Sequence, residues 1–227
     1  QAATQQLLAT ILDRRNGGES LAAAFSSHPL DANHAQNLLR ALFATGRSNT
    51  TLFQVLNDQA GAANTVPEYD EAFVAKLVTE SHREGNSTRG QTVFKNMACL
   101  SCHRVGREGG AIGPDLTSIG TTLATERIVE ELLWPNRQVK EGFAALQIFT
   151  DDGRILQGYE RRTKSSRDDG DLMIKELSTG ELLSIKRDQI DEIVEAGSAM
   201  PTGLTAVLTP EQLADLIRYL SDLGKIQ

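Results

Sequence analysis

The feature that most constrains this chain is the run Cys99-Leu100-Ser101-Cys102-His103. A Cys-x-x-Cys-His run is typical of covalent haem c attachment, because two thiols at this spacing can both reach the vinyl groups on one edge of a porphyrin. The adjacent histidine is then held beneath the ring, where its imidazole can ligate the iron. The run therefore predicts one haem c per chain, attached through Cys99 and Cys102 and ligated by His103.

Two other uses of a Cys-x-x-Cys pair have to be weighed against haem. Half of a zinc site would need further ligands, but the chain has no second cysteine pair, and the other histidines (His28, His34 and His82) lack paired ligand spacing. A redox dithiol or a local disulfide remains an alternative. A thioredoxin-like dithiol follows a strand in a βαβ pattern, which is not apparent here, so haem attachment is favoured.

Composition narrows the class of protein. The 227 residues can hold one large domain or two to three small ones, and a hydrophobic content of 40% supports buried cores. A net charge of −7 argues against a nucleic-acid partner. No apolar run approaches the roughly 20 residues that span a bilayer, so no transmembrane segment is expected. Both cysteines lie in the haem motif, so no structural disulfide is expected. The sequence does not indicate the oligomeric state.

The cellular location follows from the haem motif. Bacteria attach haem c outside the cytoplasm, so the chain is expected to be periplasmic or otherwise exported. It opens at Gln1 within helix-like sequence, without an initiator Met or a signal peptide. We therefore expect a mature or excised fragment of an exported protein.

Residues 1–84 are expected to form a helical N-terminal module. Apolar residues recur there at helical spacing, in groups that include Leu7, Leu8, Ile11 and Leu12, then Leu38, Leu39, Leu42 and Phe43, then Phe73, Val74, Leu77 and Val78. Asp31 is positioned to cap the second group. The segment carries no chemical motif, so a packing or linker role is the simplest interpretation.

Two helices are expected to frame the haem. After a polar stretch at residues 84–88, Gly90 and Phe94 lie four residues apart and share one helix face. Near the C-terminus, Thr209-Pro210-Glu211-Gln212 is a capping box with proline at the first helical position. An apolar stripe then runs through Leu213 and Leu220. We expect these two helices to cross at a contact between Gly90 and an aromatic side chain, which is the framework of small cytochromes c.

A β insert is expected at residues 143–195. Residues 143–150 alternate in hydrophobicity, and Asp151-Asp152-Gly153 is a hairpin signal before a second strand at 155–159. Residues 172–174 and 182–185, separated by a Thr179-Gly180 turn, resemble a second hairpin. The expected fold class is α+β, mainly α. It comprises the N-terminal module (1–84) and a mono-haem domain (85–227), with the antiparallel β subdomain (143–195) inserted in the latter.

The loop after the haem motif offers a partner for His103. A ligating histidine normally donates its second ring N–H to a fixed acceptor. Pro114 has no N–H and a fixed φ, so its carbonyl is free to accept. Ile112 and Leu116 could pack on the haem face and exclude water. The alternative is an ordinary Gly-Pro turn.

The sixth iron ligand has one favoured candidate. Met200 lies in a Gly/Ser/Pro loop just before the last helix, where a thioether is poorly explained as core filler. Met97 is too close to Cys99 to reach the distal face readily, and Met173 is expected in a strand. A distal histidine, chiefly His82, or an open site remains an alternative.

These motifs occur together in one known family. The run from Gly90 through Cys99–Val105, Ile112–Leu116, Trp134-Pro135, Asp152-Gly153-Arg154, Ser198–Pro201 and Asp215-Leu216 resembles the planctomycete-type haem-binding domain, a cytochrome c variant with a β insertion. The resemblance covers about residues 88–224. It implies ligation by His103 and Met200, and a haem-facing role for Pro114. It also implies that the domain ends a larger secreted protein, often with an upstream β-propeller, a dehydrogenase-like part and helical repeats.

The expected function is one-electron transfer by a low-spin haem with histidine and methionine ligands, not catalysis. The partner would be a redox protein or an upstream dehydrogenase domain. The main rival is a haem enzyme or a gas or redox sensor with an open or His-ligated distal site. A third hypothesis makes residues 1–84 and the insert an interaction module, with haem as an accessory.

Overall fold

The computed structural model describes residues 2–45, 47, 49–61, 66–161 and 171–225. The chain folds into two compact units. The first comprises Gln1–Ala60 and Val139–Pro201, and the second comprises Gly61–Gln138 and Thr202–Gln227. Helices together with a small antiparallel sheet confirm the expected α+β class. Part of the charged segment before Asp171 lies outside the described residues.

Four helices open the first unit: α1 (Ala2–Leu12), α2 (Gly17–Ser27), α3 (Ala32–Ala44) and α4 (Thr50–Gln59). Their apolar positions form the core, with Leu39, Leu52 and Leu56 almost fully buried. The predicted cap of α3 is confirmed, because the Asp31 carboxylate accepts hydrogen bonds from the backbone amides of Asn33 and His34, both at 3.1 Å.

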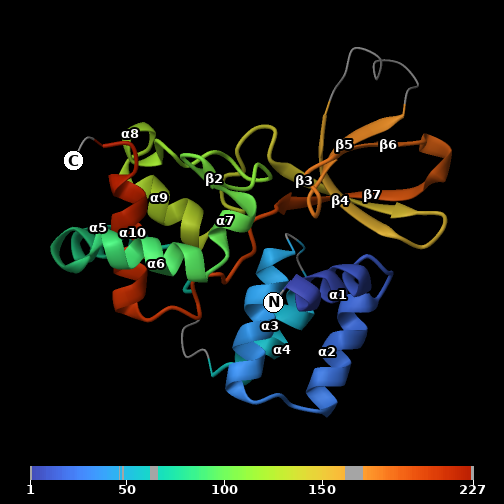
Figure 1. Cartoon of the computed structure of the whole chain (residues 1–227), viewed down its shortest axis with the longest axis horizontal. Helices are drawn as coiled ribbons and strands as arrows, with labels where there is room; N and C mark the ends of the chain where they lie inside the picture. The colour runs from blue at the N-terminus through green and yellow to red at the C-terminus, as the bar shows by residue number, and fades with distance from the viewer. Residues whose placement is uncertain (1, 46, 48, 62–65, 162–170, 226–227) are drawn as a thin grey trace. The chain divides into compact units, whose positions relative to one another are not determined.

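The same unit contains a five-stranded antiparallel sheet (Figure 1). Its strands are β3 (Ala144–Thr150), β4 (Ile155–Glu160), β5 (Leu172–Glu176), β6 (Leu182–Ile185) and β7 (Ile190–Ser198), in the order β6-β5-β4-β3-β7. One face buries Ile148, Leu172, Ile174 and Ile185 together. The sequence predicts the first four strands but not β7.

Strand β7 escaped prediction because it is an exposed edge strand. Residues Asp191 to Glu195 are all exposed, so no alternation of buried and polar side chains marks the strand. It follows a short 3-10 helix at Arg187–Gln189 and pairs with β3, placing Ala144 opposite Ser198. The two ends of the sheet segment therefore lie side by side, as the chain requires if it is to resume toward Met200.

The sheet is joined to the helices by backbone hydrogen bonds. The Ile155 amide donates to the Asp13 carbonyl at 2.7 Å, and the Arg15 amide donates to the Gly153 carbonyl at 3.4 Å. The guanidinium of buried Arg47 donates to the Asp13 carboxylate at 2.7 Å and lies 3.7 Å from Glu176. The sheet is thus built into the same compact unit as α1–α4, whereas the sequence analysis expected it as a subdomain inserted in the haem domain.

The second unit is mainly helical. Its elements are α5 (Glu71–Glu84), α6 (Ser87–Asn96), α7 (Cys99–Cys102), β1 (Arg104–Val105), β2 (Glu108–Gly109), α8 (Ile119–Thr122), α9 (Thr125–Leu133) and α10 (Pro210–Asp222). Helix α5 packs against α9 and α10. It therefore lies in this unit, although the sequence analysis placed residues 71–84 with the N-terminal module.

Helices α6 and α10 cross as expected (Figure 1). A Cβ atom at Gly90 would lie 2.0 Å from the Asp215 carbonyl oxygen, so only glycine permits this approach. The rings of Phe94 and Tyr219 pack with centroids 5.5 Å apart. The predicted capping box of α10 is also present at Thr209 and Gln212.

A buried carboxylate fastens this crossing, and sequence reasoning missed it. Asp215 is 2% exposed. It accepts two hydrogen bonds from the Arg89 guanidinium, at 2.7 and 2.8 Å, and one from the Asn86 amide at 2.7 Å. Hydrogen bonding to Asp215 raises the pKa of Arg89. Such a bidentate pair fixes the start of α6 on α10, which in turn fixes the helix that leads into Cys99.

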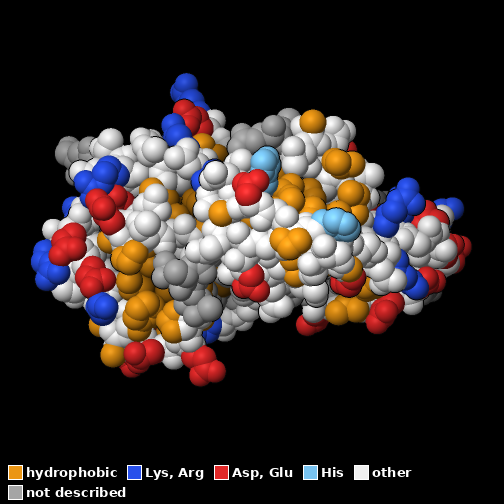
Figure 2. Space-filling view, turned by 90° about the horizontal axis from the view of Figure 1, so that it is seen from below, with side chains coloured by type: hydrophobic (Ala, Val, Ile, Leu, Met, Phe, Trp, Pro, Cys, Tyr) orange, Lys and Arg blue, Asp and Glu red, His pale blue; other side chains and the backbone are white. Residues whose placement is uncertain are grey.

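On the face drawn in Figure 2, basic and acidic side chains occur close to one another, and hydrophobic patches lie between the charged groups. Within the described ranges, no helix combines the length and apolar character required to cross a membrane.

Candidate haem attachment site

The two cysteines lie on a single helical turn. Helix α7 consists of Cys99–Cys102, and both thiols are free and partly buried. The chain enters α7 through Ala98, whose φ of 58° is left-handed and strained for a residue with a Cβ. This sharp turn at Ala98 separates α7 from α6. The two thiols lie one helical turn apart along α7, next to His103.

His103 is held in one orientation. It follows α7 in extended conformation, and its amide donates to the Cys99 carbonyl at 2.9 Å. Its ring nitrogen Nδ1 lies 2.9 Å from the Pro114 carbonyl oxygen. Because a carbonyl only accepts, Nδ1 carries the proton, and the lone pair of Nε2 is left for a metal.

The surroundings of His103 also set its charge. Burial lowers the pKa of the imidazole, while the hydrogen bond to Pro114 acts in the opposite direction. The ring is therefore neutral near pH 7, which is the form that ligates iron.

Two glycines bring the following loop against the motif. A Cβ at Gly113 would lie 2.6 Å from His103 Cε1, and the Gly113 amide donates to the Cys102 carbonyl at 2.8 Å. Gly110 donates to the Leu100 carbonyl at 2.8 Å, and its Cβ would lie 2.3 Å from the Ser101 carbonyl oxygen. Sequence reasoning selected Pro114 but not these glycines, although their position beside a proline in a short loop was a usable signal.

Ile112 and Leu116 flank this loop and are both half-buried. The Leu116 amide donates to the Arg104 carbonyl at 2.9 Å, which ties the end of the loop to the residue after His103. That both side chains face haem stays a prediction.

The thiols are in their protonated form. Burial raises the pKa of Cys99 to about 12, and the neighbouring Cys102 adds to the rise. Burial also raises the pKa of Cys102. Two adjacent thiols and one neutral imidazole fixed by Pro114 fit a haem c, with Cys99 and Cys102 forming the thioether bonds and His103 ligating the iron. In the described part of the chain, no group of three or more His, Cys, Asp or Glu could hold a metal ion.

The candidates for the sixth ligand fall in different environments. Met200 is half-buried just beyond β7, and its amide donates to Ser198 Oγ at 3.1 Å. Met97 is 5% exposed where α6 ends, and Met173 lies within β5. His82 is exposed on α5. The first compact unit contains Met200 and the second contains His103. The pairing of these two residues on one iron therefore stays a prediction.

Comparison with known families bears on the same region. Residues 87–145 match the family model described as Cytochrome c. The match supports a cytochrome c-type haem-binding domain. It starts with α6 and takes in α7, His103 and the Gly113-Pro114 turn, and this family implies covalently bound haem c with iron and a role in electron transfer. A search of curated proteins finds no match to the chain.

Proposed function

We propose that this chain is an exported one-electron carrier with one covalent haem c, ligated by His103 and Met200. The observation that carries the proposal is the hydrogen bond between His103 Nδ1 and the Pro114 carbonyl, next to two free thiols on α7. This arrangement prepares Nε2 for iron and holds the ring still, which keeps the reorganisation on electron transfer small. When bound, the haem supplies a reversible ferric/ferrous couple.

The residues of the chain would tune that couple in three ways. The Pro114 carbonyl oxygen accepts a hydrogen bond from the Nδ1–H of His103 and so raises the basicity of this ligand. Gly113 lets the loop lie directly against the imidazole, because a Cβ there would lie 2.6 Å from His103 Cε1. The Met200 thioether would raise the reduction potential relative to a second histidine, and would occupy the position where oxygen or peroxide binds.

The electron donor we propose is a redox protein or a dehydrogenase-like domain, in keeping with the family resemblance. Export follows from the compartment in which bacteria attach haem c. The rival is a haem enzyme or sensor with an open or histidine-ligated distal site. The identity of the sixth iron ligand decides between the electron carrier and this rival.

Spectroscopy of the Met200→Ala variant tests the ligand directly. The unsubstituted ferric protein should show the weak red-region charge-transfer band of a thioether–iron bond, and the variant should lose the band and have a lower potential. Met173→Ala is the matched control and should leave both unchanged. An unaltered spectrum in Met200→Ala would contradict the proposed ligand and favour His82 or an open site.

Carbon monoxide tests the carrier role. The ferrous protein should bind it slowly or hardly at all at neutral pH, because the sixth position is filled. Fast, stoichiometric binding to the unsubstituted protein would support the enzyme or sensor instead.

A further inference from the structure

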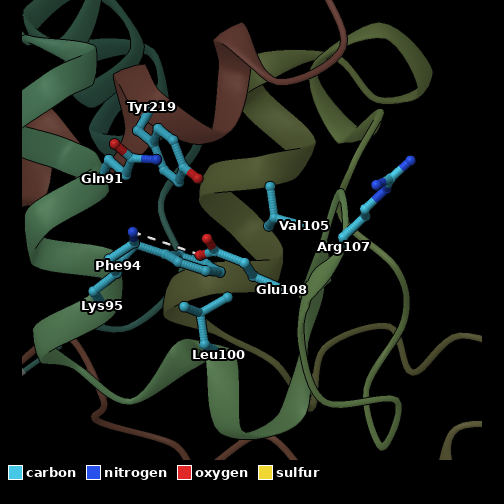
Figure 3. Close-up of a pocket in the computed structure, with 8 residues that line it drawn as sticks. All are labelled: Gln91, Phe94, Lys95, Leu100, Val105, Arg107, Glu108 and Tyr219. Carbon is cyan, nitrogen blue, oxygen red and sulfur yellow. Dashed lines mark ion pairs between the residues drawn. The ribbon is translucent and has the colours of Figure 1, made fainter.

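A cavity of about 270 Å³ opens beside the haem attachment turn (Figure 3). Its walls come from four elements of the second unit, namely α6, α7, the β1–β2 hairpin and α10. The apolar part of the wall consists of Phe94, Leu100, Val105 and Tyr219. Ligand pockets for drug-sized molecules start at roughly 300 Å³, so a single-ring compound suits this volume.

Two of the three charged side chains that line the cavity are paired. Lys95 Nζ lies 3.5 Å from Glu108 Oε2, and Figure 3 shows this ion pair spanning the space between α6 and the hairpin. The Arg107 side chain extends away from the other lining residues in the same view. The lining therefore carries one positive charge in excess, which disfavours a cationic occupant.

Hydrogen-bonding groups at one end favour hydroxyl groups on that occupant. Burial raises the pKa of Tyr219, and a hydrogen bond with the Gln91 side chain opposes the rise. Tyr219 therefore keeps its proton near pH 7 and can both donate and accept, while the Glu108 carboxylate only accepts. The aromatic wall and these acceptors together match a hydroxylated aromatic ring.

The position of the cavity gives such a ring a redox role. Leu100 lines the cavity and lies within the α7 turn between Cys99 and Cys102, so the cavity lies against the attachment turn.

We propose that this cavity binds a monocyclic hydroquinone that donates electrons to the domain. The inference rests on the proposed electron-transfer function and adds a small-molecule donor to the protein donor proposed there. With haem bound, one O–H bond of the hydroquinone would break, its electron would pass to the haem, and its proton would pass to the Glu108 carboxylate and then to water. The ring would leave as a neutral semiquinone radical, and loss of its second electron to another oxidised protein and of its second proton to water would give the quinone.

Ligand-observed NMR on the full-length ferrous protein tests binding without any reaction, with 1,4-dihydroxybenzene as the probe. Saturation transfer should show a dissociation constant of roughly millimolar, as expected for so few non-hydrogen atoms. The control probe 1,4-dimethoxybenzene, which has no hydroxyl to donate, should bind at least fivefold more weakly. Equal binding of the two probes, or no binding of either, would overturn the proposal.

Three variants locate the binding site. Val105→Phe fills the cavity and should weaken binding of 1,4-dihydroxybenzene at least tenfold. Tyr219→Phe keeps the ring, removes only the hydroxyl, and should weaken binding about fivefold. Glu84→Gln is the control, because it removes the carboxylate of another exposed ion pair in the same unit, and should change nothing. Binding that is the same in all three variants would place the ligand elsewhere and contradict the proposal.

Stopped-flow reduction separates this inference from the proposed function. The rate with 1,4-dihydroxybenzene should saturate, and Glu108→Gln should slow it about tenfold at pH 7. Hexaammineruthenium(II), which brings no O–H to break, should reduce both proteins at one rate. If the ruthenium complex reduces the haem but 1,4-dihydroxybenzene gives an unsaturating rate that Glu108→Gln leaves unchanged, the donor site is disproved and electron transfer stands. Failure of both reductants would contradict the proposed function itself.

Discussion

Each of the two compact units is held together internally by a different kind of contact. In the second unit, glycines let backbone approach backbone at Gly90 and Gly110 and let the loop approach the His103 ring at Gly113, and main-chain hydrogen bonds hold the loop against α7. In the first unit, buried charges do much of this work, with Arg47 lying between Asp13 and Glu176. We therefore expect the second unit, which contains most of the cytochrome c match, to be sensitive to added volume as well as to its one buried pair at Asp215, and the first unit to be sensitive chiefly to lost charge.

Removing both thiols should have the largest effect, and it should affect the second unit but not the first. The double variant Cys99→Ala/Cys102→Ala cannot form thioether bonds, so all haem should pass into acid–acetone. Hydrogen exchange should then speed up in α6, α7 and α10 and stay slow in β3 and β4. A similar loss of protection in the sheet would show that the two units do not hold their structure separately.

Added volume at Gly113 should have the next largest effect. In Gly113→Ala, the new Cβ would lie 2.6 Å from His103 Cε1, so the loop or the imidazole must move. Overpacking of this kind costs about 1–3 kcal/mol, and iron ligation should weaken with it. Urea unfolding and the ferric low-spin spectrum measure the two effects.

Gly106→Ala is the matched control for Gly113→Ala. Gly106 has a φ of 62° but no atom that a Cβ would touch, so only the backbone cost of about 1 kcal/mol applies, and ligation should not change. If both variants give the same spectrum and the same loss of stability, the glycine contact with His103 has no special role.

Loss of the Glu176 charge should change how the stability of the first unit depends on pH. Burial tends to raise the pKa of Glu176, but hydrogen bonds from Ser178 and Thr179 outweigh it and hold the pKa below the ordinary value of 4.5. A carboxyl with a lowered pKa in the folded state stabilises the fold above about pH 4.5, and that stability is lost as pH falls through the lower value. Glu176→Gln should cost on the order of 1–2 kcal/mol at pH 7 and flatten this acid limb.

The control for this pH effect is Asp171→Asn, an exposed carboxyl in the same unit. It should leave the pH dependence of unfolding unchanged. An acid limb of the same steepness in Glu176→Gln would assign the acid sensitivity of the unit to other groups.

The smallest effect is expected at the entry to α7. Ala98 has a φ of 58°, which glycine adopts without strain. Ala98→Gly should therefore stabilise the second unit by less than about 1 kcal/mol in urea unfolding, with no change in the haem spectrum. A clear loss of stability would mean that the left-handed turn is not a source of strain.

The sequence reveals local chemistry well in this chain. The Cys-x-x-Cys-His run, the Asp31 cap and the Thr209 capping box each depend on residues a few positions apart, and the structure contains all three elements. The Gly90 crossing was also predictable, but only together with the haem motif, because a glycine and an aromatic residue on one helix face are equally typical of ordinary amphipathic helices.

Contacts between distant segments were not predictable in the same way. The hydrogen bond from the Ile155 amide to the Asp13 carbonyl involves main-chain groups, which carry no sequence signal. Asp215 resembles any polar residue on an amphipathic helix until its partner Arg89 is known. Strand β7 has neither burial nor alternation to mark it. The packing partner of α5 likewise leaves no sequence signal. The sequence analysis therefore assigned α5 to the N-terminal module, although it packs with α10.

The central claim is that Cys99 and Cys102 carry one haem c. The most direct test is the pyridine haemochrome spectrum of the purified mature protein after acid–acetone extraction, combined with its intact mass. We predict that the haem stays with the protein, that the spectrum is that of a porphyrin with both vinyl groups saturated, and that the mass exceeds the chain by one haem. An extracted haem with intact vinyl groups, or an unmodified chain mass, would contradict the claim.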